Sequence, residues 1–427
     1  MAAAPKAAGA AESLAARLGG APAEREAALA ELLALELEHR GAALASVSAR
    51  GAARSAANAA ARVRVDIAVA CVVPLCQLLR KPAAEVGVAE WHRACQVLTA
   101  IVTTDRGRVG CELIRPGQTN MYDFFSAPEN ALGVALAKEP SALTAEDALT
   151  IAWTVGPFLS MMAGPKGVDA ALEACGLDTM AWVGEMMPHN FLVGGTGGPT
   201  PSDDRSLALM PLFLDMLKTW EQLPDFGLQA VLMATVFGVQ GRNAVAVQMV
   251  DHDAVALLTD LLHQVTPSEL ISSVDFSRRA HGAVFCVMAD VTQGAQNSGM
   301  DLTSQLLENG FIDIMISALA AVETVGADNS SAIVITYGVL NLLKNLDGAA
   351  LDQIEGRLRG APSTLRYLVN TNIEHIRDFG YTSGTFATNI AANVFGKDVR
   401  AHTATPLMHT SETVTSPVPS FQKGAFY

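Results

Sequence analysis

A run of glycines is the first feature of this sequence that could carry chemistry. Residues 194–198 read Gly-Gly-Thr-Gly-Gly, and Pro199 and Pro201 follow at once. A phosphate-binding loop requires Gly-Lys-Ser/Thr at the start of a helix that follows a strand, and a dinucleotide fingerprint requires a similar context. The run has no lysine and no preceding strand pattern, and its prolines favour a loop. We expect a mobile inserted loop over residues 192–204 and no nucleotide site.

Histidines and cysteines are the next candidates, because they bind metals and act as bases or nucleophiles. The nine histidines are scattered, and none belongs to a His-Glu-x-x-His pair. The six cysteines contain no Cys-x-x-Cys pair and lie in no set of four zinc ligands. Cys71 and Cys76 lie in an apolar run, which indicates reduced core thiols inside the cell. We therefore expect no metal and no cofactor.

Catalytic signatures are missing as well. A nucleophilic serine is usually recognised from a local pattern such as Gly-x-Ser-x-Gly, and this sequence offers none. Scattered serine, histidine and aspartate residues could be assembled into a triad in almost any chain of this length. The sequence therefore predicts a protein that is not an enzyme, and an enzyme of unrecognised type remains as an alternative.

The charge balance bears on the class of partner. Asp and Glu number 43 against 29 Lys and Arg, which gives a formal net charge of −14. A nucleic-acid binder usually presents a basic face to neutralise phosphates, so this balance argues against such a partner. The stretch with Arg40, Arg50, Arg54, Arg62 and Arg64 is interpreted as a solvated helix face. No apolar run is long enough to span a bilayer without interruption.

Helical periodicity dominates the chain. Leu29, Leu32, Leu33 and Leu37 form one apolar stripe, which predicts a helix from about residue 23 to residue 40. The same period continues to about residue 395 with short breaks, and strand signals are almost absent. We expect a flexible segment over residues 1–22, a helical domain over residues 23–397, and a disordered tail rich in Thr, Ser and Pro over residues 398–427.

Internal repeats are visible within the helical region. Residues 306–315 read Leu-Leu-Glu-Asn-Gly-Phe-Ile-Asp-Ile-Met, and residues 171–180 share with them Gly, an apolar residue, Asp and Met in order. Further on, residues 337–343 read Tyr-Gly-Val-Leu-Asn-Leu-Leu. A first helix ending near Glu-x-Gly, a second opening with an apolar residue, and a third of this type together resemble the armadillo repeat.

The resemblance implies an all-α, right-handed α-solenoid of armadillo or HEAT-like repeats. About five repeats are recognisable within residues 63–348, with helical caps at both ends. In the third helices, small or compact residues would allow close packing. These are Val97, Thr154, Ala234, Gly282 and Gly338. Their spacings of 57, 80, 48 and 56 residues all exceed the family period of roughly 40–47, so every interval carries extra residues.

The resemblance also implies a binding site, because armadillo third helices line a concave groove. Residues one turn apart on each helix would face the ligand. The first column is Gln96, Trp153, Met233, His281 and Tyr337, and the second is Ala100, Pro157, Phe237, Phe285 and Asn341. We expect Trp153, Phe237, His281, Phe285, Tyr337 and Asn341 to be partly exposed and to hold a protein or peptide, and the alternative is that the aromatic residues form core.

Two functions fit this reading. The first is a non-catalytic scaffold, cytoplasmic or nuclear, that binds partner proteins through the groove. The second is an armadillo-type nucleotide-exchange factor of the major heat-shock ATPase, or a karyopherin-like transport adaptor. Only Tyr337 with Asn341 approximates the repeated Trp-x-x-x-Asn pair of nuclear-import adaptors. Capture of basic localisation signals is therefore not expected.

Overall fold

The described residues of the computed structural model are almost all helical. They are residues 3–46, 52–104, 127–162, 203–273 and 276–322, with residues 108, 109, 112, 113, 115, 118, 119, 121–125, 335, 338, 339 and 342. No strand occurs among them, which confirms the all-α prediction. None of the helices in these ranges combines the length and apolarity needed to cross a membrane. Of the loop expected over residues 192–204, residues 192–202 lie outside the described residues, and Asp204 already begins a helix. The expected tail at 398–427 also lies outside the described residues.

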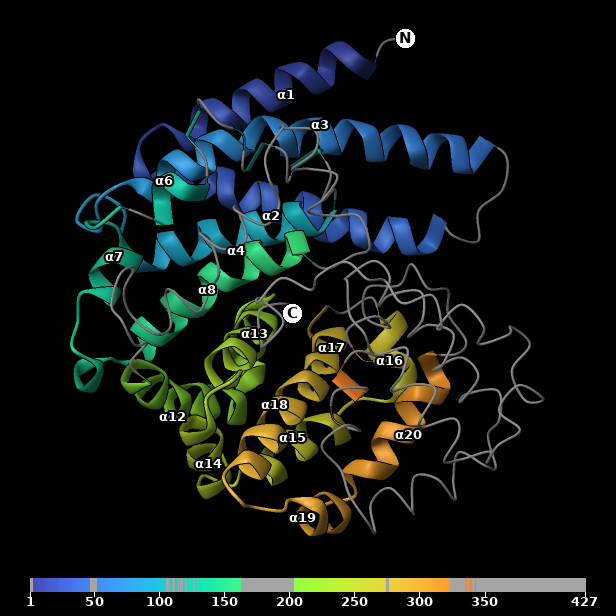
Figure 1. Ribbon diagram of the computed structural model, residues 1–427. Coiled ribbons are helices and arrows are strands. Elements are labelled where there is room, and N and C mark those ends of the chain that lie inside the picture. The colour runs from blue at the N-terminus through green and yellow to red at the C-terminus, as the bar shows by residue number, and fades with distance from the viewer. Residues whose placement is uncertain are drawn as a thin grey trace, which may run out of the picture. The chain divides into compact units, whose positions relative to one another are not determined.

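The chain forms two compact parts, and each is described by itself. The first part comprises residues 1–216 and 220–234, and the second comprises residues 217–219 and 235–427. The helices of the first part are α1 (Ala3–Leu18), α2 (Pro22–Ser46), α3 (Ala52–Arg80), α4 (Val88–Thr104), α6 (Met121–Phe125), α7 (Ala131–Leu136), η1 (Pro140–Ala142), α8 (Ala145–Met162), α12 (Asp204–Lys218) and η2 (Trp220–Gln222) (Figure 1). Helix α13 (Gly227–Val239) crosses the division between the parts, and the last two residues of α12 belong to the second part.

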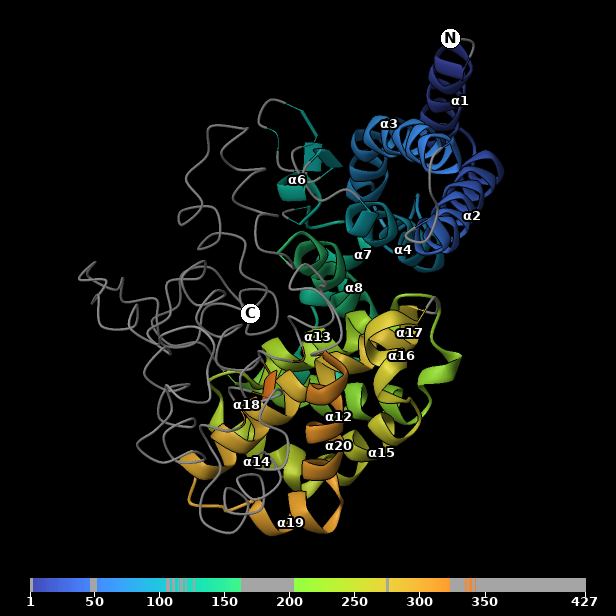
Figure 2. The same ribbon diagram turned by 90° about the vertical axis from the view of Figure 1, so that its right-hand side faces the viewer.

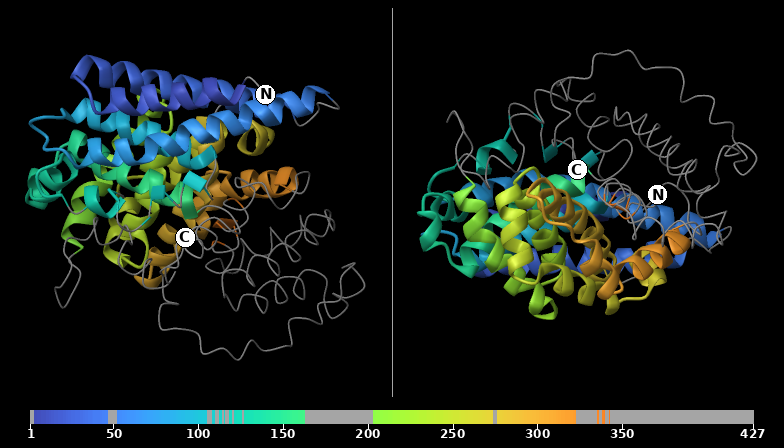
Figure 3. Two further views of the ribbon diagram at one scale, coloured as in Figure 1. Left: turned by 90° about the horizontal axis from the view of Figure 1, so that it is seen from above. Right: turned by 60° about the horizontal axis from the view of Figure 1, so that its bottom comes forward.

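Helix α1 corrects the expectation of a flexible segment over residues 1–22. It packs along α3, and both are among the blue helices of Figure 3. Ala11, Leu14 and Leu18 are buried. These positions follow a helical spacing of i, i+3 and i+7, which places them on one face. The Ala-rich composition of the segment concealed this short apolar stripe.

Helix α4 lies at the centre of the first part. It packs against α2, α3 and α8, and α2, α3 and α4 are seen nearly end-on in Figure 2.

Asn130 holds the start of α7 in place. Its side-chain oxygen accepts a hydrogen bond from the backbone N–H of Gly133 at 2.8 Å and so caps α7. Its amide donates to the carbonyl oxygens of Leu79 and Phe124, which ties the ends of α3 and α6 to the same point.

Helices α4 and α8 are equivalent elements 57 positions apart. Trp91 and Ala148 are both buried, and so are all of residues 94–97 and 151–154. Val97 and Thr154, which the sequence assigned to successive third helices, therefore lie on helices that pack against each other. The predicted neighbour relation is confirmed for this pair.

The second part is built from shorter helices. They are α14 (Asn243–Asp251), α15 (Ala254–His263), α16 (Pro267–Ser272), α17 (Phe276–Ala280), η3 (His281–Ala283), α18 (Val284–Asn297), α19 (Thr303–Glu308) and α20 (Phe311–Val322). Helix α18 packs against α14 and α15, and α20 packs against α15, α16 and α19. Residues 335, 338, 339 and 342, helical where described, follow in the chain.

The pair α14–α15 recurs as the pair α19–α20 after 57 residues. Met249, Ala254, Val255, Leu258, Leu261, Leu262 and Val265 are buried, and so are the residues 57 positions later: Leu306, Phe311, Ile312, Met315, Ala318, Leu319 and Val322. The turns are equivalent too, because Asp253 has a φ of 59° and Gly310 a φ of 75°. The same offset thus appears in both parts of the chain.

The third helices of the second part make the close approach that the sequence predicted. A Cβ atom on Gly338 would lie 2.6 Å from the backbone nitrogen of Cys286 and 2.6 Å from the carbonyl carbon of Phe285. A Cβ atom on Gly282 would lie 3.0 Å from Cγ1 of Ile335. The helices that carry Gly282 and Gly338 therefore pack together with little space between their backbones.

The two equivalent turns give a first test of this repeat. A left-handed conformation costs an L-residue roughly 1–2 kcal/mol more than glycine. Nothing lies within 4 Å of a Cβ atom at Gly310, so a substitution there meets only the backbone cost. We expect Gly310→Ala to lower the free energy of unfolding by about 1 kcal/mol, and Asp253→Gly to raise it by less than about 1 kcal/mol. Urea unfolding of both variants measures this, and equal signs would contradict the equivalence.

Candidate functional site

The helices expected to line an open groove are buried on all sides. Residues 94–102 of α4 are all buried, as are residues 280–289 in and around η3 and the start of α18. In α13 every residue is buried except Gln229, which is half-buried. Such helices are apolar all round, as expected of central core elements.

The predicted groove residues follow their helices into the core. Trp153, His281 and Phe285 are fully buried, and Phe237 is 1% exposed. The expectation that these four are partly exposed is wrong. Tyr337 and Asn341 lie outside the described residues. Among the other column positions, Gln96, Ala100 and Met233 are also buried, and no side-chain environment is described for Pro157.

In the second part, local contacts explain why the side chains of His281 and Phe285 are buried. The ring of Phe285 makes an edge-to-face contact with Phe311 of α20, with centroids 5.6 Å apart. The Nδ1 atom of His281 lies 2.8 Å from the carbonyl oxygen of Ser277, one turn earlier. The Phe285 ring therefore packs α18 against α20, and the His281 ring is held within its own stretch of helix.

No protein-family model, curated protein or solved structure matches this chain.

Chemistry-bearing side chains in the first part are likewise engaged in packing. The Nε2 atom of His92 lies 2.7 Å from Oγ1 of Thr150, which joins α4 to α8, and burial lowers the pKa of His92 to about 4. Cys71, Cys76 and Cys95 are buried free thiols, and burial raises the pKa of each. Thiols of this kind are poor nucleophiles. Within the described ranges, no three His, Cys, Asp or Glu residues are grouped as metal ligands.

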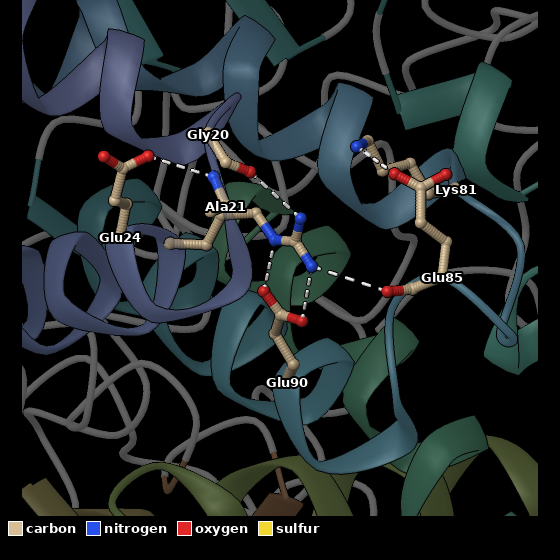
Figure 4. A network of polar contacts seen from close by, with 7 residues as sticks. Gly20, Ala21, Glu24, Lys81, Glu85 and Glu90 are labelled. Atoms are coloured by element: carbon tan, nitrogen blue, oxygen red, sulfur yellow. Dashed lines mark hydrogen bonds and ion pairs between the residues drawn. The ribbon is translucent and has the colours of Figure 1, made fainter.

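The most elaborate polar network of the first part surrounds Arg25 (Figure 4). Its Nε and Nη2 atoms donate to the two carboxylate oxygens of Glu90 at 2.5 and 3.0 Å. Its remaining N–H groups reach the carbonyl oxygens of Gly20 at 3.1 Å and Glu85 at 3.4 Å. One side chain thereby joins the start of α2 to the turn between α3 and α4 and to the first turn of α4. The geometry is that of a structural clamp, because every donor in it is directed at the protein itself.

One carboxyl group in the second part has a strongly shifted pKa. Asp290 lies on α18, one turn after Cys286, and burial raises its pKa to about 8. A carboxyl group with this pKa is mostly protonated at neutral pH. The ordinary pKa of an aspartate is about 3.9, so the folded chain holds a proton between pH 4 and pH 8 that the unfolded chain lacks.

This shift predicts a pH dependence with a definite sign. Unfolding releases the proton of Asp290 within that window, so its contribution to stability is full below about pH 4 and is lost as the pH rises toward 8. We expect Asp290→Asn to flatten the fall in melting temperature between pH 5 and pH 8. The exposed Asp260 supplies the control, because Asp260→Asn makes the same change of side chain at the protein surface. Parallel pH profiles for Asp290→Asn and wild type would contradict the assignment.

Helices α15 and α20 differ from these buried helices, because part of each faces solvent. Helices α15 and α20 pack against each other and keep one stripe each toward solvent. The stripe contains Ala256, Leu257 and Asp260 of α15 with its N-cap residue Asp253, and Asp313 and Ile314 of α20. The three aspartates are exposed, and the three apolar residues are half-buried. We call these six residues the second-helix face.

The second-helix face has a simple electrostatic character. Neither α15 nor α20 contains a lysine or an arginine. In the whole of residues 243–322 the only arginines are Arg278 and Arg279, and lysine is absent. Arg278 forms an ion pair with Glu269 at 2.9 Å. The sequence pattern of the third helices does not point to this face. The signal for it is the 57-residue offset between Leu257 and Ile314.

Proposed function

We propose that this chain is a non-catalytic scaffold that binds other proteins on an armadillo-like solenoid. The 57-residue repeat carries the proposal. Equivalent helices pack on one another: α4 with α8 and α15 with α20 at an offset of 57 residues, and the Gly282 helix with the Gly338 helix at an offset of 56. Structures that grow by such nearest-neighbour stacking are extended in one direction and expose long continuous surfaces.

The burial of the third helices changes which surface is proposed. Groove binding as expected from the sequence requires those side chains to be accessible, and Trp153, Phe237, His281 and Phe285 are not. Exposed second helices then become the surface for partner binding. Side chains there, such as Leu257 and Asp260, contribute little to the core and remain free for recognition.

A non-catalytic role fits the state of the reactive groups. The described cysteines are buried thiols with raised pKa values. The thiolate is the reactive form of cysteine, so these residues are held in their unreactive form. His92 is held in contact with Thr150 inside a helix interface.

Partner capture tests the proposal. The full chain is immobilised and exposed to lysate, and each retained protein is then purified and titrated with the free chain by calorimetry. We expect at least one protein to bind in the purified system, with amide-exchange protection in α15 and α20. An unrelated acidic helical protein is the control bait. A heat-shock ATPase among the partners would be assayed for accelerated nucleotide release, which separates an exchange factor from a passive scaffold.

The proposal fails if no retained protein binds after purification. It also fails if every protein captured by the chain is captured equally by the control bait. Because solenoids serve unrelated partners, the identity of the partner has to come from this experiment.

A further inference from the structure

The second-helix face combines half-buried apolar side chains with exposed carboxylates on two neighbouring helices. Helices α15 and α20 pack against each other, and packed helices have axes roughly 8–10 Å apart. A third helix can pack against two such neighbours in the way that they pack against each other. Leu257 and Ile314 occupy equivalent positions, 57 residues apart, on the two helices.

The charges of the face determine what kind of helix fits. Asp253 and Asp260 are seven positions apart on one side of the apolar pair, and Asp313 lies on the other helix beside Ile314. Seven residues of helix rise about 10.5 Å. A helix lying along α15 meets the two aspartates with its own residues i and i+7, which share one face. Residues i+3 and i+4 of that helix then reach Leu257 and Ile314.

We propose that the second-helix face binds an amphipathic basic helix of a partner protein, with Lys or Arg at i and i+7 and aliphatic residues at i+3 and i+4. This inference rests on the proposed function and adds the chemistry of its partner. Charge complementarity selects the basic side chains, since α15 and α20 supply carboxylates and contain no lysine or arginine. The aliphatic pair supplies the apolar area, and long basic side chains can cover it with their methylene stems.

The two aspartates at seven-residue spacing have no acidic equivalents in the next repeat, so a bound helix has one preferred position. On α20 the position equivalent to Asp253 is Gly310, and the position equivalent to Asp260 is Ser317. The acidic side chains at seven-residue spacing therefore occur on α15 alone. A bound helix is directed along α15 rather than α20, and its apolar residues face Leu257 first.

A designed peptide tests this inference without knowledge of the natural partner. The probe is a labelled Ala/Gln helix with arginines at i and i+7 and leucines at i+3 and i+4. The comparison peptide has the same composition with one arginine moved to the opposite side of the helix. Fluorescence anisotropy with the full chain measures both affinities. We expect the probe to bind at least about tenfold more tightly than the comparison peptide, and to bind less tightly as salt rises.

Variants of the full chain localise the binding. Asp253→Asn/Asp260→Asn should weaken binding of the probe by about tenfold or more, and Leu257→Ser should do the same. Asparagine tolerates the left-handed conformation at position 253, so the double variant is expected to fold. The matched control is Glu221→Gln/Asp225→Asn, which removes the same charge from two exposed residues elsewhere and should leave binding unchanged.

Three results would overturn the inference. They are equal binding of the two peptides, an equal loss in the two double variants, and no binding of the probe to wild type. The first two would show attraction by net charge alone. A natural partner that binds Asp253→Asn/Asp260→Asn as tightly as wild type would also overturn it while leaving the scaffold proposal intact. The scaffold proposal fails separately, through the absence of any purified partner.

Discussion

Replacing Gly338 by alanine is expected to lower the free energy of unfolding of the second part by about 3 kcal/mol, at the upper end of overpacking effects. The added Cβ atom would lie 2.6 Å from backbone atoms of Phe285 and Cys286 and 2.8 Å from Cβ of Phe285. Backbone atoms of a packed helix cannot turn away as a flexible side chain can. The two helices must separate, even though alanine favours a helix by about 1 kcal/mol over glycine.

Gly282 supplies the matched comparison for this prediction. A Cβ atom there would lie 3.0 and 3.3 Å from side-chain atoms of Ile335, which can adjust its rotamer. Gly282→Ala should therefore cost less than Gly338→Ala when both are measured by urea unfolding. If Gly338→Ala unfolds at the same urea concentration as wild type, the proposed packing of the third helices is wrong.

The second large effect is expected from Arg25 in the first part. Arg25 and Glu90 form a bidentate pair whose side chains are 4% and 15% exposed. Removing one member of a buried pair leaves the other charge without compensation, which costs about 3 kcal/mol or more. Arg25→Met also removes the donors to the Gly20 and Glu85 carbonyl oxygens. We expect a loss of about 3 kcal/mol in the stability of the first part.

An exposed ion pair provides the control. Arg17 and Glu31 lie 2.6 Å apart with side chains 32% and 50% exposed, so Arg17→Met should change stability by less than about 1 kcal/mol. In a double-mutant cycle, Arg25→Met/Glu90→Leu should cost less than the two single changes together, because no charge is left buried. A loss for Arg25→Met no larger than that for Arg17→Met would contradict the clamp.

Much of the fold could be predicted because helical periodicity survives in a single sequence. The stripe of Leu29, Leu32 and Leu33 predicted a helix where α2 lies, and all three residues are buried. The close approach at Gly338 could be predicted because only glycine leaves room for two backbones to meet. The helix α1 was missed, because alanine gives a weak apolar contrast.

The candidate site could not be predicted, for a physical reason. The sequence of α13 is apolar on every side, so its periodicity does not say which side faces a neighbour and which faces solvent. The choice of the solvent-facing side therefore came from the resemblance to a family with an open groove. For Phe237 and Phe285 that choice was wrong, because both side chains are buried. By contrast, α15 has polar and apolar residues on different sides, so its sequence does indicate which side faces solvent. Asp260 lies between buried leucines.

The equivalence of Asp253 and Gly310 has a consequence for how the length of this protein can change. Deleting residues 254–310 would join Asp253 directly to Phe311, so that α14 would lead into α20 through the turn it now makes with α15. Helix α14 would then pack against α20, which is equivalent to its present neighbour α15. A deletion of any other length would offset every later helix. We therefore expect this segment to tolerate the loss of one 57-residue unit better than a deletion of any other length.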